Sequence, residues 1–440
     1  MTAHTQAADI VSELLRAKNQ RSGGASIKSL VYSNNVQNKK AVYALCCETL
    51  KHLNIIKKVL EECDFLSEFK PNKFGLVYVW VYELLFGQWK KIKNFKKFQP
   101  VVKQQERLEE AYKNLKSKDA LSGDKSTLSP IELKTYPRYV RVNTLKMSID
   151  EVFDQLTSEY GEENVQRNKY LADVLELPSS IHLHGHQLIK RGSAVLQGLS
   201  SCMPVHALKP IRSWVLIDAC SAPGNKTTQL AAHLASSEGN PTDSESEPLG
   251  KIYAFDINKD RFERLCKNVR HCGADKIVQP ELRDFLAVDP RKDEKYSQVK
   301  AILLDPSCSG SGTVHSRGDF LLSGSTSSHK DREQSESEKR RIDTLASFQE
   351  KCLRHALNFP RVERIVYSTC SINVRENETV VASVLAEAER LGFGLEKALP
   401  QWPRRGFPLF EGCEKLVRVN PNRDNTEGFF LALFTRQETK

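Results

Sequence analysis

The sequence has 440 residues, of which 40% are hydrophobic and 8% aromatic, which is enough for two or three domains with apolar cores. Lys and Arg (65) outnumber Asp and Glu (55), giving a formal net charge of +10. No apolar run approaches the ~20 residues of a membrane-spanning helix, the first residues lack a signal-peptide pattern, and the 11 cysteines include no C-x-x-C pair. We therefore expect a protein that is not membrane-spanning, secreted or wholly disordered, and that works in a reducing compartment.

The excess positive charge lies in the first part of the chain. Residues 1–120 hold 21 Lys and Arg against 12 Asp and Glu, whereas residues 121–440 hold 44 against 43. The segment WKKIKNFKKF at 89–98 interleaves five lysines with Trp89, Phe95 and Phe98. It is interpreted either as an RNA contact, with lysines on phosphates and rings on bases, or as a solvated helix face whose aromatics enter the core. The charge of the whole segment favours a polyanionic partner.

Residues 1–120 are predicted to be a basic helical RNA-binding region. Apolar residues at helical spacing predict a helix over 41–62, and a charged helix is expected over 104–118. The turn-rich residues 117–130 indicate a linker. A strand within 136–146 and a helix over 148–160 then predict a small α+β RNA-recognition module over residues 121–205.

Residues 206–440 alternate between strands and helices. Strands are predicted over 214–219, 251–255, 299–304, 364–368 and 428–434, and helices over 225–234, 259–272, 342–357 and from after Cys370 to 389. This order predicts an α/β domain with a mostly parallel sheet and helices on both faces. The polar, Ser-rich segments 236–250 and 321–340 are predicted to be mobile surface insertions.

Chemically capable residues follow the predicted strands. Asp218, Asp256, Asp305 and Cys370 all fall at strand carboxyl ends, where ligands bind in parallel sheets. Asp256 is placed to hold ribose hydroxyls, and Asp284 could reach a nucleobase edge. Each aspartate could instead cap a turn, but several in register favour nucleoside-cofactor binding.

The segment after the first of these strands predicts a tight turn into a helix N-terminus, which presents backbone N–H groups to a ligand. It contains one glycine and is not the G-x-G-x-x-G of dinucleotide binders, so an NAD-dependent dehydrogenase is disfavoured. Its candidate cofactor-binding residues are Cys220, Ser221, Ala222, Pro223, Gly224, Asn225 and Lys226.

Two cysteines lie in loops after predicted strands. Cys308 is surrounded by small residues in DPSCSGSG, so its thiol is expected to be accessible. Cys370 precedes a predicted helix that Ser371 or Asn373 can cap, and the positive end of that helix should lower the pKa of Cys370 and favour the reactive thiolate. A buried apolar role is the usual alternative for a cysteine, but these positions weaken it.

Three histidines alternate in IHLHGHQ. His182, His184 and His186 would share one face of a strand, a spacing that can bind a metal. No further ligand is evident in the sequence, so we expect no metal.

Several motifs occur together in a recognisable order. They are RVNTLK at 141–146, VLQGLSSCMP at 195–204, DACSAPGNKT at 218–227, DPSCSGSG at 305–312, YSTCS at 367–371, ENE at 376–378 and TEGFFLALF at 426–434. In this order they resemble the Nop2/Sun family of S-adenosylmethionine-dependent RNA cytosine-5 methyltransferases over about residues 135–436. The basic first part, with GASIKSLVY at 24–32, is similar to the subgroup that acts on large-subunit ribosomal RNA, the fifth Nop2/Sun member.

The resemblance implies a Rossmann-like class I methyltransferase domain with a mostly parallel seven-stranded sheet. It implies that residues 220–226 line the methionine end of S-adenosylmethionine, with Asp256 on the ribose, Asp284 near adenine and Arg261 a further contact. Cys370 matches the nucleophile of the family and Cys308 its second, product-releasing cysteine. Asp305 would hydrogen-bond the target cytosine and also border the cofactor.

The resemblance also implies a biological setting. We expect large-subunit ribosomal RNA and a pre-ribosomal particle as partners, in the nucleus and nucleolus, with no membrane partner. The alternatives are a tRNA cytosine-5 methyltransferase and an RNA-binding ribosome-assembly factor with vestigial activity. Two positions depart from the family turn, which has Ala where Ser221 stands and Gly where Asn225 stands. Asn tolerates unusual backbone angles, so the turn should survive.

Overall fold

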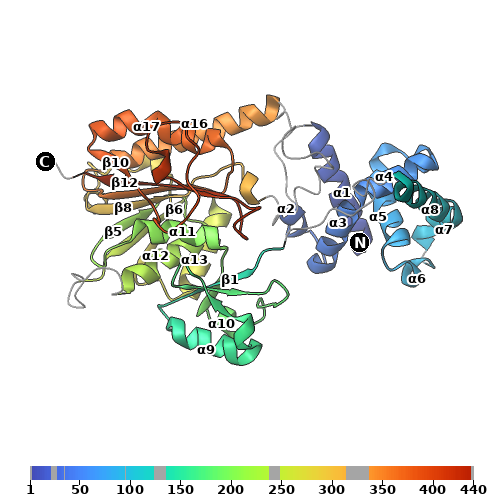
Figure 1. Cartoon of the computed structure of the whole chain (residues 1–440), viewed down its shortest axis with the longest axis horizontal. Helices are drawn as coiled ribbons and strands as arrows, with labels where there is room; N and C mark the ends of the chain where they lie inside the picture. Colours follow the sequence, from blue (N-terminus) through green and yellow to red (C-terminus); the bar gives the residue numbers. More distant parts are fainter. Residues whose placement is uncertain are drawn as a thin grey trace. The chain divides into compact units, whose positions relative to one another are not determined.

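The computed structural model of the chain describes residues 2–20, 27–33, 35–94, 96–122, 135–236, 248–313 and 336–437. Contacts divide the chain into two compact units, residues 1–134 with 314–338, and residues 135–313 with 339–440 (Figure 1). The finer limits expected from the sequence, at residues 120 and 205, stay predictions. No helix within the described ranges is long and apolar enough to cross a lipid bilayer.

The described part of the first unit is helical, as predicted. Its α-helices are α1 (Ala3–Gln20), α2 (Ile27–Val31), α3 (Lys39–Lys51), α4 (Leu53–Glu62), α5 (Phe74–Leu85), α6 (Trp89–Ile92), α7 (Gln99–Lys103) and α8 (Gln105–Ser122). Short 3-10 helices lie at η1 (Phe65–Glu68), η2 (Pro71–Lys73) and η3 (Lys96–Phe98). Helices α1, α3 and α5 pack together around a core of fully buried aliphatic side chains.

Two predicted boundaries in this unit are wrong. The helix expected over 41–62 is interrupted at His52, whose backbone angles (φ −96°, ψ 2°) leave the helical range and separate α3 from α4. The linker expected over 117–130 begins too early, because α8 continues to Ser122. Residues 123–130 lie outside the described ranges.

In the basic segment at 89–98, the described aromatic side chains are buried and most of the lysines are exposed. Trp89 and Phe98 are buried, and the Trp89 indole N–H donates to Gln105 Oε1 at 2.9 Å. Lys90, Lys91 and Lys93 are exposed. The interpretation of these two rings as base-stacking groups is therefore wrong, because the helical core takes them. Phe95 lies outside the described residues.

The second unit contains a small antiparallel sheet in the order β2-β3-β1-β4. Its strands are β1 (Arg138–Val142), β2 (Gln166–Arg167), β3 (Val174–Leu177) and β4 (Ala194–Leu196). One face packs against α9 (Ile149–Tyr160) and α10 (Gln187–Lys190), and Ser148 caps α9 through a reciprocal bond pair with Glu151. The other face, through Tyr139 and Val174, joins the core beneath the large sheet.

The large sheet has the strand order β10-β12-β9-β8-β5-β6-β7, with β11 paired to β12. Five neighbouring strands are parallel: β7 (Val278–Leu282), β6 (Lys251–Asp256), β5 (Val215–Asp218), β8 (Val299–Leu304) and β9 (Arg364–Thr369). Three further strands complete it: β12 (Phe429–Arg436), which runs antiparallel to β9, and β10 (Phe393–Glu396) and β11 (Val417–Val419), which both pair antiparallel with β12. The predicted seven-stranded path is confirmed, and β11 adds an eighth strand.

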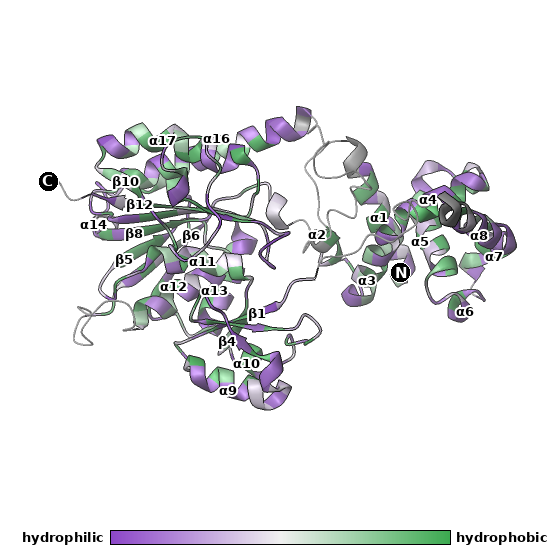
Figure 2. Cartoon of the chain, in the orientation of Figure 1, coloured by the Kyte–Doolittle hydropathy of each residue, from purple (hydrophilic) through white to green (hydrophobic). Residues whose placement is uncertain are grey.

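Helices cover both faces of this sheet (Figure 1). One face carries α11 (Leu199–Leu208), α12 (Asn225–Ala235) and α13 (Lys259–His271), and the other carries α16 (Glu336–Leu357) and α17 (Glu378–Arg390). The short α14 (Glu294–Ser297) precedes β8. Successive residues of a strand point into opposite cores: Leu216 packs in the core under α11, α12 and α13, and Ile217 in the core under α16 and α17. This double burial explains the continuous apolar strands seen in Figure 2.

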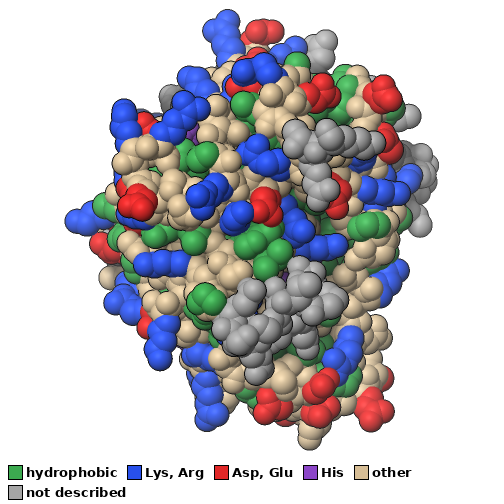
Figure 3. All heavy atoms as spheres, turned by 90° about the vertical axis from the view of Figure 1, so that its left-hand side faces the viewer, with side chains coloured by type: hydrophobic (Ala, Val, Ile, Leu, Met, Phe, Trp, Pro, Cys, Tyr) green, Lys and Arg blue, Asp and Glu red, His purple; other side chains and the backbone are tan. Residues whose placement is uncertain are grey.

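Short 3-10 helices mark several connections in this unit. They are η4 (Glu162–Asn164), η5 (Phe285–Ala287), η6 (Ser311–Thr313), η8 (Val374–Glu376) and η9 (Cys413–Lys415). On the face of the unit shown in Figure 3, basic and acidic side chains are interspersed, in keeping with the near-neutral charge of residues 121–440.

Three further expectations need correction or limits. Helix α16 begins at Glu336, so the last residues of the predicted insertion 321–340 are helical; residues 314–335 and 237–247 lie outside the described ranges. Residues 182, 184 and 186 form no strand. Instead, His186 caps α10 through Nδ1 and bonds Glu159 through Nε2.

Candidate active site

The carboxyl ends of the parallel strands bring the predicted residues to one edge of the sheet. Strand β5 ends at Asp218 and β6 at Asp256, while Asp305 directly follows β8 and Cys370 directly follows β9. Because β6, β5, β8 and β9 are consecutive neighbours, these side chains form one row. The sequence pattern therefore predicted this convergence correctly.

The turn after β5 is a compact loop held by its neighbours. The Ser221 hydroxyl and N–H both donate to the carbonyl oxygen of Phe255, at 2.8 and 2.9 Å. Gly224 takes φ +104° at the start of α12, a left-handed angle that only glycine adopts at low cost. Asn225 is the first residue of α12. The turn thus survives the Gly-to-Asn departure because Gly224, not Asn225, takes the unusual angle.

Asp256 and Arg261 border this turn. The Arg261 guanidinium donates to the carbonyl oxygen of Ala222 at 2.9 Å and lies 3.3 Å from the Asp256 carboxylate. Asp256 Oδ1 also accepts from the N–H of Asn258 at 2.9 Å. Asp284 follows β7 and caps η5 by accepting from the N–H of Leu286. Asp284 therefore caps a turn, which was the alternative to ligand binding in the sequence analysis. It lies at the same edge of the sheet as Asp256.

Two exposed aliphatic side chains at this edge escaped the sequence reasoning. Ile257 directly follows Asp256 and is 72% exposed, and Leu282, paired in register with Asp256 across β6 and β7, is 50% exposed. Apolar side chains this exposed at strand ends suit contact with an apolar ligand surface. The signal was present in the sequence as Asp256-Ile257, an apolar residue after the strand-ending acid.

Asp218 is buried beneath the turn. Its Oδ2 accepts from the Thr227 hydroxyl at 2.7 Å, while Oδ1 has no hydrogen-bond partner among the described residues. Burial raises the pKa of Asp218 to about 7, and the charge of Asp305 adds to the shift. The sequence had assigned Asp218 no more than a place at a strand end.

Asp305 pairs with the first turn of α12. Lys226 Nζ lies 2.6 Å from Asp305 Oδ2, and the Ser368 hydroxyl donates to Oδ1 at 2.9 Å. Burial opposes the charged form of Lys226, but the Asp305 carboxylate outweighs it and raises the Lys226 pKa. This ion pair connects the turn after β5 with the loop after β8. The predicted cofactor turn and the predicted cytosine-binding loop are therefore held together by one pair of opposite charges.

The two cysteines of interest are in contact. The sulfur atoms of Cys308 and Cys370 lie 3.2 Å apart as a hydrogen-bonded pair, and none of the 11 cysteines forms a disulfide. The hydrogen bond to Cys370, together with burial, raises the pKa of Cys308 well above its usual value. A proton kept on Cys308 is available for a hydrogen bond to the Cys370 sulfur. Cys308 is half-buried rather than openly accessible.

The structural basis expected for activating Cys370 is wrong. Helix α17 begins only at Glu378, and Asn373 precedes the short η8 without a side-chain capping bond. Ser371 instead accepts from the N–H of Asn373 within the loop. Cys370 therefore does not adjoin the N-terminus of α17, and its sulfur contacts the Cys308 thiol instead.

A fully buried carboxylate holds the two cysteine loops together. Glu376 accepts from the Ser309 N–H at 2.8 Å and hydroxyl at 2.5 Å, from the Ser371 hydroxyl at 2.6 Å, and from the side-chain amides of Gln349 and Asn373. Burial alone would raise the pKa of Glu376, but these donors lower it below its usual value. Sequence reasoning noted the ENE motif but assigned it no role.

The rest of the ENE motif also supports the Cys370 loop. The Asn377 amide donates to the carbonyl oxygen of Ser371 at 2.9 Å, and Glu378 forms a buried ion pair with Arg418. Arg418 in turn donates to the carbonyl oxygen of Ile372 at 2.8 Å. These contacts fix the backbone on the carboxyl side of the nucleophile candidate.

Close backbone packing completes the arrangement. The N–H of Gly312 donates to the carbonyl oxygen of Cys370, and the N–H of Gly428 to that of Gly312, both at 2.9 Å. A Cβ on Gly312 would collide with the backbone oxygen of Gly428. The motifs DPSCSGSG, YSTCS and TEGFF, far apart in sequence, thus form one packed structure.

The sheet order with its reversed strand β12, and the row of acids and cysteines at its carboxyl edge, define the fold of a Rossmann-like class I methyltransferase. Residues 205–435 match a family model described as 16S rRNA methyltransferase RsmB/F, and residues 40–128 match the NOL1/NOP2/Sun domain family member 5, N-terminal domain. The chain belongs to this NOL1/NOP2/Sun (RsmB/F) family.

Similar proteins span nearly the whole chain. The 25S rRNA (cytosine-C(5))-methyltransferase NSUN5 of Arabidopsis thaliana is 44% identical over 99% of this chain and 73% of its own length. The 28S rRNA (cytosine-C(5))-methyltransferase of Mus musculus is 37% identical over 94% of this chain and 88% of its own.

Solved structures show the same fold. A methyltransferase homologue from Pyrococcus horikoshii aligns with TM-score 0.54 at 21% identity, covering 86% of this chain and 99% of the other. NSun6 from the same organism, with SFG, aligns with TM-score 0.51 at 21% identity, covering 70% and 92%.

Glu376→Gln is expected to lower the unfolding free energy by about 1–3 kcal/mol at pH 7, because the new amide N–H₂ faces hydrogen-bond donors. The pKa of Glu376 is lower when folded, so its contribution is present above the usual value of 4.5 and is lost as pH falls below it. In urea unfolding between pH 7 and pH 3, the difference in unfolding free energy between the parent and Glu376→Gln should therefore become smaller as the pH falls. The exposed Glu396→Gln is the control, and an equal gap at all pH values would contradict the role of the Glu376 charge.

Asp218→Asn is expected to change how stability depends on pH. Because the folded-state pKa of about 7 exceeds the ordinary 3.8, the folded chain holds the extra proton between these values. The unfolding free energy contributed by Asp218 therefore falls as pH rises through that window. Asn cannot ionise, so the variant should gain stability relative to the parent between pH 5 and pH 8 in urea unfolding. Parallel pH profiles, matching those of the exposed control Asp275→Asn, would refute the buried-acid assignment.

Proposed function

We propose that this chain transfers a methyl group from S-adenosylmethionine to C5 of a cytosine in large-subunit ribosomal RNA. The observation that carries the proposal is the Cys308–Cys370 sulfur pair beside Asp305, at the sheet edge that also holds the cofactor turn. The names of the relatives support the substrate, since the proteins 44% and 37% identical act on 25S and 28S rRNA.

The residues at the edge of the sheet fit the cofactor. The turn at 219–225 and Lys226 would face its methionine end, Asp256 the ribose hydroxyls, and Ile257 and Leu282 the faces of the adenine. Asp284 and Arg261 border the same region. Bound there, S-adenosylmethionine supplies an electrophilic methyl group.

The cysteine pair makes cytosine C5 reactive. The Cys370 thiolate adds to C6, forming an S–C6 bond and moving the electron pair of the C5–C6 double bond towards C5, which then takes the methyl group. Asp305, held between Lys226 and Ser368, can accept a hydrogen bond from the N4 amino group of the cytosine and so orient the base, while the Lys226 ammonium beside it offsets the negative charge that builds on the ring.

Release needs a base to accept the C5 proton. When a solvent molecule acting as base takes this proton, the C5–H electron pair forms the C5–C6 double bond, the S–C6 bond breaks and Cys370 leaves as thiolate. Cys308 lies against Cys370 and can donate a hydrogen bond to the departing sulfur. A stacked base cannot reach these sulfurs, so the cytosine must be flipped out or held in a loop.

The rRNA assignment is favoured over a tRNA substrate. A tRNA (cytosine(49)-C(5))-methyltransferase of Pyrococcus abyssi is 29% identical over 67% of this chain, whereas the 25S and 28S rRNA enzymes of Arabidopsis thaliana and Mus musculus cover 99% and 94% of it. A vestigial assembly factor would not need both cysteines and the Asp305–Lys226 pair. We extend the proposal to action on a pre-ribosomal particle in the nucleolus, tested by co-localisation of tagged protein with nucleolar markers.

Cys370→Ala is expected to abolish methyl transfer to large-subunit rRNA, while Cys308→Ala should accumulate a covalent protein–RNA adduct because release fails. Bisulfite sequencing of rRNA and denaturing gels of the labelled adduct measure the two outcomes. The buried Cys352→Ala serves as the matched control. Equal transfer by the parent and Cys370→Ala would overturn the nucleophile assignment, and methylation confined to tRNA would overturn the substrate.

The exposed lysines of the first unit should act on RNA binding alone. Replacing Lys90, Lys91, Lys93 and Lys96 with Gln is expected to weaken rRNA binding and reduce the slope of log K against log salt by up to about 3, since each phosphate contact contributes ~0.7–0.9. Cofactor affinity should not change. The control replaces four exposed lysines of the second unit: Lys267, Lys276, Lys292 and Lys397. Equal effects of both sets would contradict a specialised RNA surface.

A further inference from the structure

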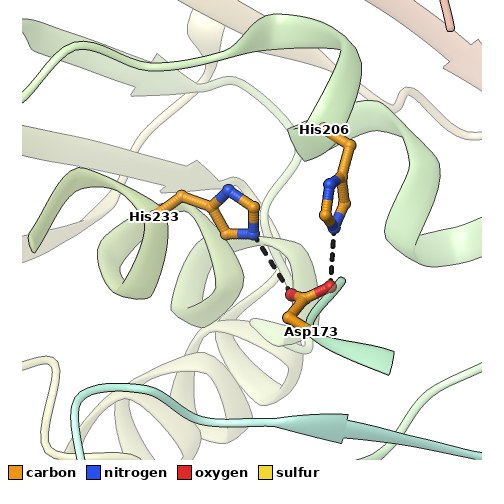
Figure 4. Close-up of side chains that lie close together, drawn as sticks. All are labelled: Asp173, His206 and His233. Atoms are coloured by element: carbon orange, nitrogen blue, oxygen red, sulfur yellow. Dashed lines mark hydrogen bonds and ion pairs between the residues drawn. The ribbon is translucent and has the colours of Figure 1, made fainter. Parts of the chain in front are cut away.

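Two histidines and one aspartate meet away from the candidate active site (Figure 4). Asp173 lies in the turn before β3, His206 in α11 and His233 in α12. Asp173 Oδ1 is 2.6 Å from His206 Nε2, and Oδ2 is 3.1 Å from His233 Nε2. The three ligand atoms all lie within 4.8 Å of one another. We propose that this Asp173 cluster binds one divalent transition-metal ion, for which Zn²⁺ is the best chemical match.

The donor set and spacing suit that ion. Two imidazole nitrogens and one carboxylate oxygen are common zinc ligands, at about 2.0–2.2 Å from the metal. Ligand atoms on a tetrahedral Zn²⁺ at those distances are about 3.3 Å apart. Both rings already direct Nε2 at the same carboxylate, so the ion takes the place of two N–H protons and only small side-chain movements are needed.

The surroundings orient the carboxylate. Gln229, one turn before His233 on α12, donates its amide N–H to Asp173 Oδ2 at 3.1 Å, and its Oε1 accepts from Gln197. Hydrogen bonds of this kind hold the ligands of metal sites in position. Asp173 is only 6% exposed, whereas the His206 and His233 side chains are 16% and 23% exposed. Solvent can therefore reach the cluster and supply a fourth ligand.

The position of the cluster gives the ion a structural role. It would tie a turn of the small sheet to α11 and α12, and α12 begins at the candidate cofactor turn. The cluster is not visible in the sequence, because its ligands are 27 to 60 residues apart, whereas His182, His184 and His186 stand at alternate positions. This inference departs from the expectation that the protein has no metal, and it does not depend on the proposed function.

The test measures metal binding by the full-length protein directly. Metal-stripped protein is titrated with ZnCl₂ by calorimetry and with CoCl₂ by visible absorption, and thermal unfolding is followed with and without Zn²⁺. We expect one equivalent bound, tetrahedral Co²⁺ bands without thiolate charge transfer, and a raised Tm. His206→Ala and His233→Ala should lose the binding step, and Gln229→Ala should weaken it roughly 10- to 100-fold.

Three controls keep the outcome decisive. The exposed His184→Ala should bind the metal like the parent. The double variant Cys308→Ser/Cys370→Ser should also bind like the parent, and it tests whether these two neighbouring sulfurs, rather than the Asp173 cluster, hold the ion. Asp173→Asn preserves the shape of the side chain while removing its charge, and should lose binding even if the alanine variants fold poorly. No Zn²⁺ or Co²⁺ binding by the parent, or binding lost only with the cysteines, would overturn the proposal and leave a hydrogen-bonded cluster.

Discussion

The buried carboxylate of Glu376 is the constraint on which the cysteine site depends. A carboxylate removed from water is stable only when donors surround it, and here the donors come from both loops that carry the cysteines, at Ser309 and Ser371. Satisfying one charge therefore fixes the distance between two loops that are 62 residues apart in sequence. The 3.2 Å contact between the sulfurs is the chemical result of that electrostatic requirement.

A second ion pair connects this centre to the cofactor side. Lys226, in the first turn of α12, forms an ion pair with Asp305, which follows β8. The helix that begins at the cofactor turn therefore also holds Asp305, the side chain expected to contact the target cytosine. Asp218 lies in the same group of acids, where burial raises its pKa and the charge of Asp305 adds to the shift. The site works as one polar network at the carboxyl edge of the sheet.

Much of the large sheet was predictable from the sequence because its strands are buried on both faces. Such strands are continuous apolar runs, and β8 was predicted at the bounds the structure has. Strands β10 and β11 were missed, because they are short and lie towards the edge, where apolar patterning is weak. In the helical unit, the sequence could not settle whether Trp89 and Phe98 face RNA or core, since helical spacing is the same in both cases.

The sequence by itself determined the strand order along the chain, the acids and cysteines at strand ends, and the resemblance that their joint order carries. Only the tertiary structure decided which groups meet. It paired Cys308 with Cys370, gave Glu376 its role, placed Ile257 and Leu282 on one edge, and assembled Asp173 with His206 and His233. The physical reason is that the apolar pattern of a strand is local in the sequence, so it shows where the strand ends and which polar residue follows. The partners of a buried polar group are set instead by the packing of segments that are distant in the sequence.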